Sequence, residues 1–153
     1  KKYPDIVLCG SMWRELIEKK LSKQIATFVE TDQAIKKSMS LFNPFSHSAV
    51  IFRKKTFITA GGYSERFKYS QDYELWLRML AFGKTLILKE ELAVVRMSEQ
   101  SESHKNARKQ KLEALQIRWD AFQQFGGNPG QALYYFFKTL MGLISPSKGN
   151  LNR

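Results

Sequence analysis

The most constraining feature of this sequence is a segment, residues 73–82, that is apolar on nearly every side of a helix. Its apolar members are Tyr73, Leu75, Trp76, Leu77, Met79, Leu80 and Phe82. A helix at a protein surface keeps a polar face toward water, so a helix without one is predicted to be buried. Gly83 follows and is predicted to end it. The rest of the chain must therefore surround this helix.

Short segments of strand and helix character lie on both sides of the buried helix. Runs of β-forming or apolar residues predict strands over 5–10, 48–53, 86–89 and 92–95, and weaker patterns predict helices over 12–21 and 32–40. Gly61-Gly62 predicts a turn, because glycine adopts positive φ without steric cost. This mixture predicts an α/β chain.

The sequence changes character at the polar segment 98–103, where we predict a boundary between residues 1–103 and 104–153. Beyond it, Leu112, Leu115, Trp119 and Phe122 recur at helical spacing and predict one apolar stripe on a helix. A strongly apolar last helix is predicted over residues 130–144. It is shorter than the roughly 20 residues of a membrane span, so we expect it to dock on the domain or to lie in an interface.

Positive charge is concentrated in the last third of the chain. The net charge is +11, and residues 105–153 contain only two acidic residues, Glu113 and Asp120. Their basic residues are Lys105, Arg108, Lys109, Lys111, Arg118, Lys138, Lys148 and Arg153. Such a balance predicts polyanionic neighbours. One alternative is therefore a non-catalytic basic module that binds an anionic membrane or nucleic acid through this region; a solvated helix face is the other explanation.

Several classes of chemistry find no support in the sequence. The two histidines, His47 and His104, lack the close partners of a zinc site, and the single cysteine, Cys9, excludes an internal disulfide. One cysteine also fits a reducing compartment. The motifs of the nucleophile elbow, the P-loop and the dinucleotide-binding loop are absent from the sequence. We therefore predict no metal ligand set within this chain.

Asp72 is the candidate for acid–base chemistry. It stands where the glycine-bearing loop passes into the buried helix, so its carboxylate is expected at a helix N-terminus close to solvent. A general base suits that position. An aspartate in a first helical turn also commonly binds free backbone N–H groups, and position alone favours this helix cap.

An ordered set of motifs favours the general base over the helix cap at Asp72. It comprises residues 43–53 (NPFSHSAVIFR), Gly61-Gly62-Tyr63, residues 70–78 (SQDYELWLR) and residues 92–96 (LAVVR). Together they resemble the second, acceptor-side half of family 2 glycosyltransferases of the GT-A fold, over about residues 5–103. The resemblance implies a partial GT-A, Rossmann-like α/β fold with short mixed strands, followed by a C-terminal helical tail.

The resemblance also implies roles for individual residues. In that family the aspartate of the Asp-Tyr-x-Leu-Trp-x-Arg element deprotonates the acceptor hydroxyl, and this role carries over to Asp72. Gly61, Gly62 and Tyr63 would lie under the acceptor, with Tyr63 either stacking on a sugar ring or packing beside the turn. Trp76 belongs to the same element, but a place in the core is favoured over acceptor contact.

Three further residues are expected near the donor diphosphate. His47 either faces the cleft or is a satisfied, partly buried histidine. Arg78 either faces the diphosphate or pairs with a carboxylate, and the structural role is favoured. Arg96 ends the last family strand, but Ser98 stands where a histidine often follows. Gln71 is a second departure, since an acidic residue frequently precedes the catalytic aspartate.

The resemblance implies partners as well. The parent protein is expected to use a nucleotide-sugar donor, a glycan or lipid-linked acceptor in polysaccharide biosynthesis, and Mg²⁺ or Mn²⁺. The Asp-x-Asp element that holds the metal is absent from this sequence. We therefore expect this chain alone to be inactive. A cytoplasmic location is expected, with possible peripheral association of residues 105–153 with the inner face of the membrane, and nucleic acid is not expected as a partner of the enzyme.

Overall fold

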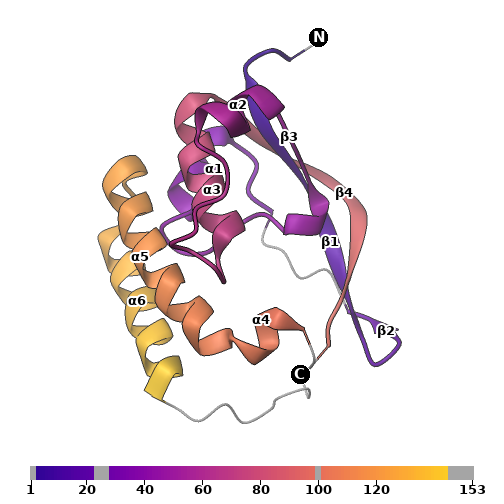
Figure 1. Cartoon of the computed structure of the whole chain (residues 1–153), viewed down its shortest axis with the longest axis vertical. Coiled ribbons are helices and arrows are strands. Elements are labelled where there is room, and N and C mark those ends of the chain that lie inside the picture. The colour runs from indigo at the N-terminus through magenta and orange to yellow at the C-terminus, as the bar shows by residue number, and fades with distance from the viewer. Residues whose placement is uncertain (1–2, 23–27, 99–100, 145–153) are drawn as a thin grey trace.

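The computed structural model describes residues 3–22, 28–98 and 101–144 of the 153-residue chain. It contains a mixed four-stranded sheet, with α1, α3, α5 and α6 on one side of it (Figure 1). The strands are β1 (Ile6–Ile17), β2 (Lys20–Leu21), β3 (Val50–Phe52) and β4 (Lys84–Arg96). The helices are α1 (Asp32–Ser38), η1 (His47–Ala49), α2 (Lys54–Thr59), α3 (Gln71–Met79), η2 (Leu80–Phe82), α4 (Glu102–Lys105), α5 (Ala107–Phe125) and α6 (Pro129–Ile144). The predicted α/β class is confirmed, and the arrangement is consistent with a partial Rossmann-like fold followed by C-terminal helices.

Strand β1 is the centre of the sheet. It pairs in parallel with β4 along most of its length, and antiparallel with both β3 and β2. The β1–β3 register sets Leu8 opposite Phe52 and Gly10 opposite Val50. This pairing places η1, which immediately precedes β3, beside the middle of β1.

The prediction of a helix over residues 12–21 was wrong. Strand β1 continues to Ile17, a turn follows, and β2 returns along it. The partner that holds this segment extended is β4, which lies far along the chain and is invisible to a local helical pattern. The turn uses Glu18 and Lys19 at positive φ, without the glycine or asparagine that usually announces such a turn.

Two strands predicted over residues 86–89 and 92–95 are one continuous strand, β4. The register between β1 and β4 shifts around Met12, opposite Glu91, and the irregularity accommodates the charged residues that separate the two apolar runs. Arg14 binds Glu91 there, with Nε 2.6 Å from Oε2. The short helix α2 was not predicted, because residues 54–59 carry no helical pattern of their own.

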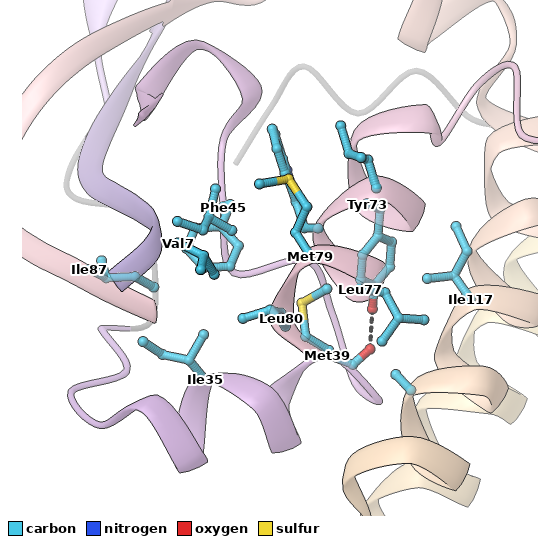
Figure 2. Close-up of a cluster of buried hydrophobic side chains, with 14 of the residues drawn as sticks. Val7, Ile35, Met39, Phe45, Tyr73, Leu77, Met79, Leu80, Ile87 and Ile117 are labelled. Atoms are coloured by element: carbon cyan, nitrogen blue, oxygen red, sulfur yellow. Dashed lines mark hydrogen bonds between the residues drawn. The ribbon is translucent and has the colours of Figure 1, made fainter. Parts of the chain in front are cut away.

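The buried core lies between strands β1 and β4 of the sheet and helices α1, α3 and α5 (Figure 2). Trp76, Leu75 and Met79 of α3 are almost completely buried, as the apolar segment predicted. Tyr73 reaches across to α1, where its hydroxyl donates a hydrogen bond to the Met39 carbonyl (Figure 2). Gly83 ends this segment with an extended φ of 172°, and a Cβ on it would lie 2.5 Å from Val7 Cγ1. Close approach of the chain, and not a left-handed cap, therefore requires glycine there.

Helix α5 presents a different face to the core than expected. Ile117 and Ala121 are fully buried in the common core, whereas the predicted stripe residues Leu112 and Trp119 are more than half exposed. The other stripe residues, Leu115 and Phe122, line a groove between α5 and α6 together with Trp119. The stripe thus faces the last helix and solvent, and a second face of α5 packs on the residues before the predicted boundary.

Candidate active site

The glycine turn is formed where α2 ends. Gly61 and Gly62 have φ values of +85° and +67°, the left-handed region that favours glycine. The Gly61 amide donates to the Ile58 carbonyl (3.0 Å), and the Gly62 amide donates to the Phe57 carbonyl (3.0 Å). The predicted turn is confirmed, and it places Tyr63 near Asp72, at the start of α3.

Arg78 holds this turn against α3. Its Nη2 donates to the Gly62 carbonyl (2.7 Å), and its Nη1 donates to the Ala60 carbonyl. Its Nε and Nη2 also donate to the two Glu74 carboxylate oxygens, at 2.6 and 2.7 Å. A bidentate pair of this kind fixes the plane of the guanidinium group. The predicted structural role of Arg78 is confirmed, and contact with a diphosphate would require these bonds to be given up.

Asp72 is the second residue of α3 and is half-buried. The loop that precedes this helix is bound by α5: the Glu113 carboxylate accepts from the backbone amides of Lys68 (3.1 Å), Tyr69 (2.8 Å) and Ser70 (2.7 Å). Within the described residues, neither a backbone amide nor a cationic side chain binds the Asp72 carboxylate. Asp72 thus lies in the first helical turn, as predicted, but its carboxylate caps no backbone amide among the described residues and can bind another partner.

Sequence reasoning missed Glu113. It lies outside the region of resemblance, and nothing local distinguishes it from the polar residues around it on α5. The contact is reinforced by Gln110, whose Nε2 donates to the Tyr69 carbonyl (3.0 Å), and by the Ser70 hydroxyl, which donates to the Gln110 carbonyl (3.2 Å). Helix α5 thus fixes the segment that leads into Asp72.

Tyr63 lies near Asp72 and contacts His47. His47 Nε2 and Tyr63 Oη are joined by a hydrogen bond of 3.1 Å, and their rings meet edge to face at 6.2 Å. Burial and the nearby negative charge of Asp72 raise the pKa of the Tyr63 hydroxyl. The Tyr63 side chain nevertheless remains 41% exposed. The structure therefore brings together four of the predicted elements: His47, the glycine turn, Tyr63 and Asp72.

Trp76 lies beneath this group. Its ring is 6.1 Å from His47 and 5.4 Å from Phe52, and its side chain is fully buried. A side chain without exposed surface cannot stack on a sugar in this arrangement, so the acceptor contact predicted for Trp76 is corrected to a core position, which the sequence already favoured. Its contribution is to support His47 and the strand behind it.

Arg96 is exposed at the end of β4, opposite Leu16 of β1. In the described part of the chain, no hydrogen bond or ion pair joins it to His47, Tyr63 or Asp72. The structure therefore does not add Arg96 to the cluster, and its donor role stays a prediction.

A divalent metal does not fit the residues of this site. Among residues 3–22, 28–98 and 101–144, no group of three or more His, Cys, Asp or Glu side chains could hold a metal ion. The Mg²⁺ or Mn²⁺ implied by the resemblance would need ligands from another part of the parent protein.

Comparison with known proteins places the chain among relatives of glycosyltransferases. No protein-family model matches the sequence. It is 32% identical over 83 residues to the amylovoran biosynthesis glycosyltransferase AmsE of Erwinia amylovora. It is 34% identical over 82 residues to the UDP-Gal:alpha-D-GlcNAc-diphosphoundecaprenol beta-1,3-galactosyltransferase of Escherichia coli. Each match covers 54% of this chain and 30% of the relative, so the matched segment corresponds to about a third of a glycosyltransferase.

Proposed function

We propose that this chain forms the acceptor-side part of an inverting, family 2 glycosyltransferase of the GT-A fold, with Asp72 as the general base. The observation that carries the proposal is the Asp72 carboxylate at the start of α3, which has no hydrogen-bond or ion-pair partner among the described residues and lies near the exposed Tyr63 ring. Similarity to two glycosyltransferases supports the class of reaction.

The proposed step is a single displacement. The Asp72 carboxylate accepts the proton of an acceptor hydroxyl, and the oxygen of that hydroxyl forms a bond to the anomeric carbon of the donor sugar. The bond from that carbon to the nucleoside diphosphate breaks at the same time, and the diphosphate leaves with the electron pair. A sugar hydroxyl is a weak nucleophile, so removal of its proton in the transition state accelerates attack, by roughly 10²–10⁴-fold for a well-placed base.

The acceptor would lie over the turn formed by Gly61, Gly62 and Tyr63. Tyr63 offers an exposed aromatic ring to a sugar, and its hydrogen bond to His47 fixes the direction of that ring. Because the E. coli relative's name specifies a diphosphoundecaprenol-linked acceptor, we include glycans and lipid-linked sugars among the acceptors of this protein. The donor would be a nucleotide sugar, and the reaction would take place on the cytoplasmic side of the membrane.

The donor nucleotide and the metal would be bound by another segment of a longer parent protein, since the chain spans about 30% of the relatives' length. We accordingly propose that residues 1–153 alone have no transferase activity. A non-catalytic basic module is the alternative, and the similarity to two glycosyltransferases over about half of the chain favours the transferase.

The test uses the parent protein with UDP-galactose and GlcNAc-diphosphoundecaprenol as the first donor and acceptor, followed by a panel of other nucleotide sugars. Asp72→Asn is expected to lower kcat by about 10²-fold or more, with little change in melting temperature, because the carboxylate has no structural partner in the described residues. Asp120→Asn on α5 is the matched control, since it makes the same carboxylate-to-amide change outside the cluster and can keep the oxygen that accepts from Gln116. A parent enzyme with Asp72→Asn that turns over at the wild-type rate would exclude Asp72 as the base.

A further inference from the structure

Helix α6 exposes its large apolar side chains, whereas an ordinary surface helix buries them. Its partly buried residues are Ala132, Tyr135, Thr139, Gly142 and Leu143, of which three are small. Its exposed residues include six large apolar side chains, here called the outer face: Leu133, Tyr134, Phe136, Phe137, Leu140 and Met141. A surface helix normally buries its apolar side and exposes a polar one. The outer face of α6 is therefore suited to an apolar environment other than its own domain.

The contacts that hold α6 against α5 are partly polar. Arg118 Nη1 donates to the Thr139 hydroxyl, and Lys111 Nζ donates to the Gly142 carbonyl at 3.0 Å. Between the two helices runs a groove of about 560 Å³ with a mainly apolar lining that includes Leu133 and Phe136 of the outer face. The apolar surface thus continues from α6 onto α5, where Trp119 is 56% exposed.

The only charged residue of α6 itself is a lysine. No acidic residue follows Asp120 in the sequence, and Lys138 is exposed on α6 itself. The Lys138 ammonium lies over the Tyr135 ring, 5.8 Å from its centroid. Lysine at the border of an apolar face can extend toward lipid phosphates while its methylene groups stay in the apolar layer. Aromatic and aliphatic side chains with a cationic border match the boundary between headgroups and acyl chains of an anionic bilayer.

We propose that the outer face of α6 binds the surface of an anionic membrane, with the helix lying in the plane of the bilayer. In the described part of the chain, no helix is long and apolar enough to cross a membrane. A symmetric contact between two outer faces would bring a Lys138 from each copy to one apolar interface, and α6 contributes no carboxylate to pair with either. The proposal is independent of the role of Asp72.

The test measures binding of residues 1–153 to vesicles of phosphatidylglycerol and phosphatidylcholine, by co-sedimentation. The double variant Phe137→Glu/Met141→Glu is expected to bind at least about tenfold more weakly than wild type, because each large apolar side chain removed from the bilayer costs roughly that factor. The matched control, Ile51→Glu/Ile58→Glu, makes the same charge change at two apolar residues outside α6 that are at least as exposed, and it is expected to stay within about twofold of wild type. The single variant Phe137→Ser, which changes no charge, should weaken binding in the same direction.

Circular dichroism and light scattering accompany each measurement. Vesicle binding by the folded double variant at the wild-type level would overturn the proposal, as would a wild-type chain that does not bind the anionic vesicles. A wild-type dimer that the outer-face variant converts to a monomer, with vesicle binding unchanged, would assign the face to a second copy instead.

Discussion

Helices α5 and α6 are neighbours in sequence and in space, yet they have different relations to the rest of the molecule. Helix α5 places Ile117 and Ala121 in the common core and uses Glu113 to fix the segment before Asp72. Helix α6 touches α5 with mostly small residues and leaves its large apolar residues exposed. An apolar helical sequence is therefore not sufficient to identify a core helix: the partner of each face decides whether it stabilises the fold or offers a surface.

The difference between the two helices is tested most directly by substitutions that remove similar apolar groups from each. Ile117→Ala in α5 is expected to lower the free energy of unfolding by about 2–5 kcal/mol, because it leaves a cavity in a fully buried position. Met141→Ala in α6, which removes a side chain that is 59% exposed, should change it by less than about 0.5 kcal/mol. Denaturant unfolding of the chain measures both, and equal losses would show that α6 also carries the fold.

A second effect, intermediate in size, is expected at Glu113. Its carboxylate accepts three backbone amides, so Glu113→Ala should cost about 1–3 kcal/mol of unfolding free energy and should speed amide exchange at residues 68–70. Glu113→Gln keeps one acceptor oxygen and should lose less. Hydrogen exchange at residues 132–142 of α6 serves as the internal control, and faster exchange there as well would contradict a local role for Glu113.

The division between what could and could not be predicted follows the range of the interactions. The buried helix α3 and the turn at Gly61-Gly62 depend on local pattern and on glycine geometry, and both were predicted correctly. The course of residues 12–21 depends on pairing with the distant β4, and a local helical pattern gave the wrong answer. Helix α2 was missed for want of any pattern of its own.

The candidate site shows the same division. The ordered motifs were sufficient to select His47, Tyr63, Asp72 and Arg78, which the structure places in or next to one cluster. Glu113 could not have been selected, because its importance comes from three amides more than forty residues earlier in the chain. Trp76 was selected for a family position, while its complete burial became visible only in the fold.

The smallest expected effect concerns the Asp72 carboxylate of α3, a negative charge that has no counterpart on α6. Burial and the negative charge of Asp72 both disfavour the tyrosinate form, so the pKa of Tyr63 lies above its ordinary value of about 10. Asp72→Asn should therefore shift the pKa of Tyr63 downward, while the elevation due to burial remains. Because the folded-state pKa exceeds the unfolded one, the stability contributed by neutral Tyr63 is fully present below pH of about 10 and is lost as the pH rises through the folded-state pKa.

NMR titration of the labelled Tyr63 ring measures the shift, with Tyr134 of the outer face as the matched control. Equal shifts of the two tyrosines would show that the Asp72 charge does not act locally on the site.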